Sequence, residues 1–165
     1  MLFRSEVSGE PTASITFDDI TKRTAFSTQQ QVWTENGITF THDKGTSLTN
    51  IQDYRNPIRI YKGSSVTINF NRKISQIKIA CNSLYNSQDY AQNLLNSIDP
   101  AVASVTIDGV EVTIKLKTPA DSFTFTATAG QVRIQQLYVW ATVSLDTSTE
   151  EPDFDLDVNF DDLRP

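Results

Sequence analysis

The sequence predicts an all-β protein: an antiparallel β-sandwich, jelly-roll or immunoglobulin-like, with one short helix and an extended C-terminal arm. Three observations predict this fold. Short runs rich in β-branched and aromatic residues recur along the chain, turn signals such as Asn36-Gly37 separate them, and only one stretch has helical spacing. The 165 residues fit one domain plus extensions.

The strands are predicted from alternation, because successive side chains of a strand point to opposite faces. Ile15 and Phe17 show this pattern, as do Val66, Ile68 and Phe70. On this basis strands are expected at residues 13–17, 31–34, 38–42, 58–61, 65–70, 76–81 and 122–126, with a turn at residues 62–64.

The most distinct local signal is a hairpin in residues 104–117, SVTIDGVEVTIKLK. Two β-branched runs flank Asp108-Gly109, a pair suited to a type I′ turn in which both central residues have positive φ. The sequence therefore predicts two antiparallel neighbours joined at Asp108-Gly109.

One helix is predicted at residues 87–98. Tyr90, Leu94 and Ile98 recur every four residues and share one face, with Ser87 as the expected N-cap and Asp89 in the first turn. Pro100 follows as a stop signal.

The last strand of the body, residues 131–141, has an inconsistent alternation. Val132 and Ile134 share one face, whereas Leu137, Val139 and Ala141 have the opposite parity. A β-bulge at residues 135–136 would bring all five to the core side, since one extra residue shifts the period. A strand buried on both faces is the alternative.

A possible sugar-binding patch follows from the bulge. With the five apolar residues inside, Arg133, Tyr138 and Trp140 face outward and offer aromatic faces on which a pyranose ring can stack. Trp and Tyr are also ordinary core and edge residues of β-sandwiches, which is the competing interpretation.

Composition divides the chain into an N-terminal extension (1–12), a sandwich (13–142), a linker (143–152) and an acidic-hydrophobic arm (153–165). Residues 1–142 carry 12 acidic and 13 basic side chains, whereas from Val143 onward eight acidic residues accompany one basic residue, Arg164. The acidity is thus a property of the C-terminal segment. The body has no basic block and no RNA-binding aromatic motif, so nucleic acid is not an expected partner.

The arm reads DFDLDVNFD at residues 153–161, and aspartates, with Asn159 in one place, alternate with apolar residues along it. An extended chain would place Phe154, Leu156, Val158 and Phe160 on one face, with Asp153, Asp155 and Asp157 on the other; Asp161 and Leu163 follow. Strand addition to another subunit would bury the apolar face, and the aspartates would oppose indiscriminate pairing. The alternatives are an arm that folds back as an edge strand of its own domain and an arm that is disordered in solution.

No catalytic or cofactor signature is present. The only histidine, His42, is a strand neighbour of Asp43 and points to the opposite face, so it is interpreted as a turn-edge residue. The only cysteine, Cys81, is expected to be an inert core thiol. Cys81 and His42 cannot form a transition-metal site, and the arm lacks the glycine and the glutamate of an EF-hand loop. We therefore expect neither an enzyme nor a bound cofactor or metal.

The N-terminus shows no apolar h-region and the chain no run of about 20 apolar residues, so neither a secretory signal nor a membrane partner is expected. The stretch QQVWTENGITFTHDKGTSLTNIQDYRNPIRIYKGSSVTI, with KIACN, SVTIDGVEVTI, DSFTF and AGQVRI, resembles small galactose-binding-like or jelly-roll modules in surface proteins of gut bacteria and structural proteins of their phages. The likeness covers about residues 13–140. It implies adhesion, glycan binding or structural decoration rather than catalysis.

Together these observations predict a non-enzymatic subunit of a larger assembly that docks through its arm onto other protein subunits. A phage virion is the first expectation, with the chain as a capsid decoration or a fibre- or tail-associated protein. The alternative is a carbohydrate-binding module at the bacterial cell surface.

Overall fold

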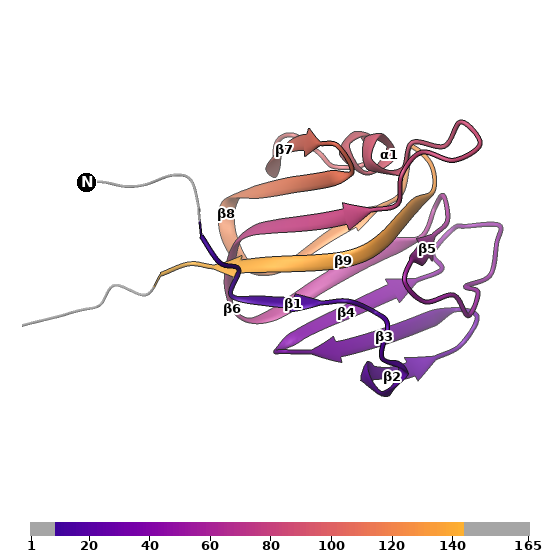
Figure 1. Cartoon of the computed structure of the whole chain (residues 1–165), viewed down its shortest axis with the longest axis horizontal. Coiled ribbons are helices and arrows are strands. Elements are labelled where there is room, and N and C mark those ends of the chain that lie inside the picture. Colours follow the sequence, from indigo (N-terminus) through magenta and orange to yellow (C-terminus); the bar gives the residue numbers. More distant parts are fainter. Residues whose placement is uncertain (1–8, 144–165) are drawn as a thin grey trace, which may run out of the picture.

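The computed structural model describes residues 9–143 and shows an all-β, sandwich-like fold with one short helix, as the sequence predicts (Figure 1). The elements in chain order are β1 (Ala13–Ile15), the 3-10 helix η1 (Ile20–Lys22), β2 (Arg23–Phe26), β3 (Gln30–Glu35), β4 (Ile38–Asp43), β5 (Ile58–Ile60), β6 (Ser65–Cys81), α1 (Tyr90–Asn96), β7 (Ala103–Asp108), β8 (Glu111–Thr126) and β9 (Val132–Ala141).

All strand pairings among these elements are antiparallel, and they form one sheet that curls into two layers. One layer contains β2, β3, β4, residues 65–69 of β6 and residues 122–126 of β8. The other contains β9, flanked on one side by β1 and β5, then residues 74–81 of β6, residues 111–115 of β8, and β7. The two long strands β6 and β8 therefore run through both layers, with register shifts where they bend.

The core lies between the layers and follows the strand alternation. Phe17, which comes just after β1, packs edge-on against Trp33 at 5.6 Å and Phe40 at 4.7 Å between ring centroids, so one ring joins the two layers. Across the sandwich the inward side chains are almost fully buried. They include Ile38, Ile58, Ile60, Val66, Ile68, Ile77, Ile79, Val112, Ile114, Phe123, Phe125, Leu137 and Val139.

The predicted bulge in β9 is confirmed. Ala80 pairs with Gln136 but the next residue, Cys81, pairs with Ile134, so Gln135 is the extra residue. Val132, Ile134, Leu137 and Val139 are all completely buried, and Ala141 packs against the core from a partly buried position.

The predicted hairpin is confirmed, but its turn lies one residue later. Asp108 pairs with Glu111, so the turn residues are Gly109 and Val110. Gly109 has φ of +65°, whereas Val110 is not among the residues with positive φ, which is the pattern of a type II′ turn. The expected type I′ turn at Asp108-Gly109 is wrong because the glycine occupies the first central position.

The helix is shorter than predicted and its N-cap is not Ser87. Asp89 caps it, because its Oδ1 accepts a hydrogen bond from the Gln92 backbone N–H at 3.1 Å. Ser87 has φ of +67° and belongs to the preceding turn. Tyr90, Leu94 and Ile98 are buried, as the spacing predicts. No helix within residues 9–143 is long and apolar enough to cross a membrane.

Two other differences concern strands. The predicted strands at 65–70 and 76–81 are one continuous strand, β6, and the strand at 122–126 continues the second strand of the hairpin as β8. β2, a four-residue edge strand with a register shift between Arg23 and Ala25, is not predicted from the sequence.

Candidate binding surface

The candidate site is a surface of arginines and aromatic rings at the end of the sandwich where β9 begins and the short antiparallel strand β5 pairs with it. Arg59 in β5 and Arg133 in β9 pair directly across two antiparallel strands. They therefore extend on the same face, outward, between the buried pairs Ile58/Ile60 and Val132/Ile134.

Each of these two arginines stacks on a tyrosine. The Arg59 guanidinium carbon lies 3.8 Å from the ring centroid of Tyr54, and that of Arg133 lies 4.8 Å from the centroid of Tyr90. Within residues 9–143 neither makes an ion pair; the polar contact of Arg133 is a hydrogen bond from Nε to Gln131 Oε1 at 2.6 Å. Like charges directly opposite one another destabilise a sheet unless an anion or stacking compensates.

The loop of residues 51–57, which supplies Tyr54, also carries a third arginine, Arg55. Tyr54 and Arg55 are both exposed, by 42% for Tyr54. We call Tyr54, Arg55, Arg59 and Arg133 the arginine surface.

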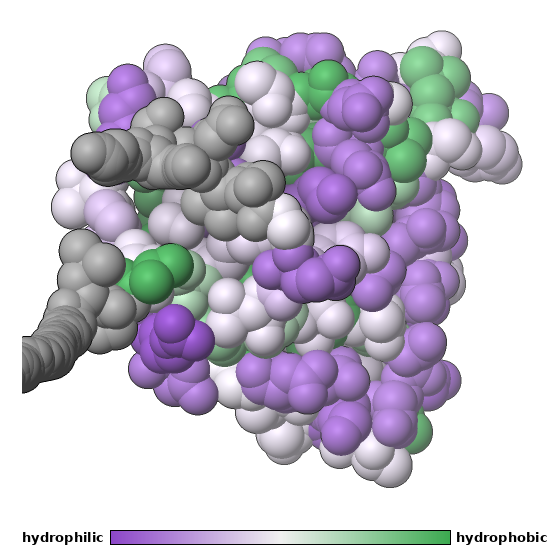
Figure 2. Space-filling model, turned by 60° about the vertical axis from the view of Figure 1, so that its left-hand side comes forward, coloured by the Kyte–Doolittle hydropathy of each residue, from purple (hydrophilic) through white to green (hydrophobic). Residues whose placement is uncertain are grey.

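Side chains of mixed hydropathy cover the face of the sandwich seen in Figure 2, with hydrophobic areas as separate small patches among hydrophilic ones.

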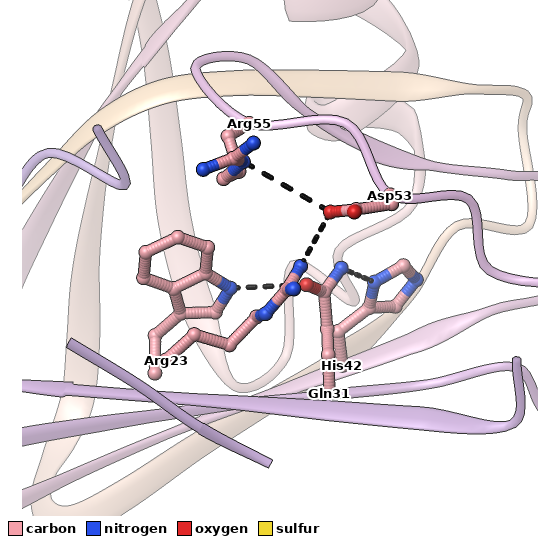
Figure 3. Close-up of polar contacts among 6 residues, drawn as sticks. Arg23, Gln31, His42, Asp53 and Arg55 are labelled. Atoms are coloured by element: carbon pink, nitrogen blue, oxygen red, sulfur yellow. Dashed lines mark hydrogen bonds and ion pairs between the residues drawn. The ribbon is translucent and has the colours of Figure 1, made fainter. Parts of the chain in front are cut away.

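Arg23 fastens this loop to the other layer (Figure 3). Its Nη1 donates to Asp53 Oδ1 at 2.7 Å, and Arg55 Nε lies 3.9 Å from the same oxygen. The Arg23 guanidinium also stacks over Phe26 at 4.2 Å and Trp33 at 5.9 Å. The hydrogen bond from Arg23 is the main reason that the pKa of Asp53 lies below its usual value.

A buried hydrogen-bond chain lies beneath Arg23. Trp33 Nε1 donates to Gln31 Oε1, and Gln31 Nε2 contacts His42 Nδ1, both at 3.0 Å. Since the indole can only donate, the Gln31 amide N–H must point at His42, so Nδ1 accepts and the neutral ring carries its proton on Nε2. Figure 3 shows Gln31 and His42 side by side on the inner face of neighbouring strands.

His42 is therefore not the turn-edge residue that the sequence suggested. It is completely buried, and burial lowers its pKa to about 4, only partly opposed by the Asp43 charge. Its Nε2 has no hydrogen-bond partner among the described residues. A neutral, enclosed imidazole cannot meet a substrate, so its chemistry here is that of a core polar group.

A second candidate is an open groove lined by loops, with a volume of about 970 Å³. Its lining is polar and almost uncharged, with Thr49, Tyr61, Gln88, Asn93 and Gln131 among the residues. Gly63, with φ of +95°, lies so close to the backbone of Ser47 that a Cβ there would be 2.9 Å from its nitrogen. The loops that line the groove are therefore tightly packed against each other.

The predicted glycan patch is split by the fold. Tyr138 and Trp140 lie together, with ring centroids 6.4 Å apart, but Trp140 is only 8% exposed and its Nε1 donates to the Gly9 carbonyl. Arg133 stacks on Tyr90 instead of joining them. The three side chains do not form one continuous platform.

Cys81 is buried, and burial raises the pKa of its thiol to about 12. Among the described residues no three His, Cys, Asp or Glu side chains gather into a potential metal site. The predicted arm, with Phe154, Leu156, Val158, Phe160 and Leu163 and its aspartates, lies outside residues 9–143.

Sequence reasoning missed the arginine surface. Its members are scattered at positions 54, 55, 59 and 133; the pairing of β5 with β9 joins Arg59 to Arg133, and the preceding loop adds Tyr54 and Arg55. The one available signal was Arg59 and Arg133, each flanked by two β-branched apolar residues. No protein-family model, curated protein or solved structure matches this chain.

Proposed function

We propose that this protein is a non-enzymatic structural or attachment subunit of a larger assembly and docks through its C-terminal arm. A phage particle is the assembly that we favour, with the chain as a capsid decoration or a fibre- or tail-associated protein. The observation that carries the proposal is the alternation of polar and apolar residues from Asp153 to Asp161, in which every polar residue except Asn159 is an aspartate.

The place where the chain leaves the sandwich supports this role. The backbone of Thr142 is held by Lys73, whose carbonyl accepts its N–H at 2.9 Å, and by Arg72, whose Nη2 donates to its carbonyl at 3.2 Å. The segment after Val143 thus starts from a firmly fixed point at one end of the molecule. A sandwich that holds the start of its C-terminal segment in a fixed place suits attachment of the body at a defined position on a particle.

Fractionation of particles tests the proposal. Particles from the producing culture are separated on a density gradient, and the full chain is compared with a version that ends after Thr142. We expect the full chain in the particle fraction and the shortened chain among free proteins. A full chain that remains with free proteins would refute the assembly role.

The alternative is a carbohydrate-binding module of a bacterial surface protein, favoured by the polar groove. Hydroxyl and amide side chains with one aromatic ring, Tyr61, are the groups that hold neutral sugars through hydrogen bonds and stacking. Retention of the full chain on immobilised polysaccharides, lost in Tyr61→Ala and Gln88→Ala but kept in Tyr138→Ala, would favour the groove. Loss in Tyr138→Ala alone would favour the patch at Tyr138 and Trp140.

A further inference from the structure

We infer that the arginine surface is the receptor for the C-terminal arm, residues 153–163, of a second copy of this chain. The inference rests on the docking role proposed for the arm and names its partner. It starts from Arg59 and Arg133, two facing cations without an acidic partner among residues 9–143.

Stacking leaves these arginines ready for carboxylates. A guanidinium that lies flat on a tyrosine ring keeps its N–H groups free at the edge, in the plane where they can bind a carboxylate with two parallel hydrogen bonds. The Arg59 guanidinium carbon lies 3.8 Å from the centroid of the Tyr54 ring. The Arg59 Nε is buried and the Arg133 Nε is bonded to Gln131, so the terminal Nη groups are the donors that a carboxylate would meet. Stacking therefore holds the arginine side chains in one conformation before a carboxylate binds, and less conformational entropy is lost on binding.

The arm has the complementary chemistry and spacing. In an extended chain every second side chain recurs after about 6.6–6.8 Å on the same face, so Asp153, Asp155 and Asp157 would form a row of carboxylates. The apolar residues of the arm would meet exposed apolar side chains in a loop next to Arg133. Leu84 and Tyr85 are 63% and 60% exposed in the loop that begins at Asn82, which donates its N–H to the Arg133 carbonyl.

Geometry favours an arm from another copy. Arg133 is the second residue of β9, and the chain leaves at the opposite end of that strand, so about eight residues or roughly 27 Å separate the two points. The linker of residues 143–152 spans at most about 33–36 Å when fully stretched. A flexible chain of this length has a typical end-to-end distance of only about 16–19 Å. A molecule's own arm would therefore reach its own arginine surface only with a nearly straight linker.

Light scattering on the full chain tests the inference. The intact protein should associate in a concentration-dependent and salt-sensitive way, and removal of residues after Thr142 should leave a monomer. Arg55→Glu should weaken association by about tenfold to a hundredfold, the effect of losing one charged contact and adding a repulsive one. The Arg55 side chain is 42% exposed and its contact with Asp53 is long, at 3.9 Å, so this variant should lose little stability and fold. Lys117→Glu changes an exposed cation in β8, which does not contribute to the arginine surface, and is the matched control; it should associate normally.

A charge exchange completes the test. Arg55→Glu/Arg59→Glu and Asp153→Lys/Asp155→Lys/Asp157→Lys should each be monomeric alone, and their mixture should regain association. Circular dichroism melting confirms that each variant is folded.

Three outcomes would overturn the inference. The first is a full chain that stays monomeric at every concentration, and the second is arm-dependent association that is indifferent to Arg55→Glu and to the charge exchange. The third is a monomer in which hydrogen exchange around Arg59 is slowed by the molecule's own arm. None of these decides the proposed function, which the particle fractionation tests separately.

Discussion

The side-chain amide of Gln31 donates to Nδ1 of His42 over 3.0 Å, and both residues are almost completely buried between the layers. Among residues 9–143, Gln31 is thus the hydrogen-bond partner both of the Trp33 indole N–H and of His42 Nδ1. Its loss should therefore cost more than one hydrogen bond.

Gln31→Leu tests this chain of hydrogen bonds. The change keeps a similar volume but leaves the Trp33 N–H and the His42 Nδ1 without partners, so the free energy of unfolding should fall by about 2–4 kcal/mol. Gln30→Leu is the matched control at the neighbouring, exposed position, where the amide bonds to Asp43, and should change stability by less than about 1 kcal/mol. Equal effects in urea unfolding would show that Gln31 has no special role.

Acid should destabilise the protein through His42. Its pKa is about 4 in the folded state against 6.5 for an unconstrained histidine, so only the unfolded chain binds a proton between these values. The contribution of His42 to the free energy of unfolding is therefore fully present above about pH 6.5. It decreases as the pH falls towards 4, by about 3 kcal/mol in total. Urea unfolding from pH 8 to 4.5 should show a steeper loss in the parent than in His42→Gln, which lacks the titrating group. Parallel curves would contradict this assignment.

Arg23→Ala should loosen the loop that carries Tyr54 and Arg55. The change removes the contact with Asp53 and uncovers the rings of Phe26 and Trp33, with an expected cost of about 1–2 kcal/mol. Tryptophan fluorescence should shift to longer wavelength, and hydrogen exchange at residues 51–57 should accelerate. Lys22→Ala, the adjacent cation, should change neither.

Two glycines should respond differently to alanine. Gly109→Ala meets open space but forces a side chain to φ of +65°, which should cost about 1–2 kcal/mol. Gly63→Ala combines positive φ with a Cβ only 2.9 Å from the Ser47 nitrogen, so its cost should exceed that of Gly109→Ala by at least about 1 kcal/mol. Thermal melts compare the two variants directly. An equal decrease in melting temperature would show that the loop at Ser47 moves to make room for the added Cβ.

Deletion of Gln135 should unfold the protein. Without the extra residue, either Val132 and Ile134 or Leu137 and Val139 would turn outward, and two core side chains would be lost at a cost above about 4 kcal/mol. Gln135→Ala keeps the residue count at an exposed position and should be nearly neutral. A folded deletion variant would mean that β9 can shift its register.

Periodicity was a reliable guide where one face of a strand is buried. It located the bulge in β9, because five apolar residues with inconsistent parity can share a core only through an extra residue. It was less informative at β2, where three of the four residues are exposed and no alternation exists. The N-cap was misplaced because Ser87 and Asp89 are both good caps, and local turn geometry chose between them.

The binding surface was harder to predict because it depends on contacts between distant segments. In the sequence His42 stands next to the turn at Lys44-Gly45. Its complete burial follows from the packing of the two layers, which the sequence does not show. Arg59 and Arg133 are 74 positions apart and meet through a three-residue pairing. The predicted tyrosine and tryptophan patch assumed that outward residues are free, whereas the segment at Gly9 contacts Trp140.

The strands β6 and β8 belong to both layers, and this has a mechanical consequence. In a sandwich made of separate sheets, a pulling force can slide one sheet off the other. Here a force that pulls one layer away from the other is also carried by the backbone of β6 and β8, two strands that continue without a break from layer to layer. The sandwich should therefore unfold in a single event at high force. This property would suit the attachment role proposed above.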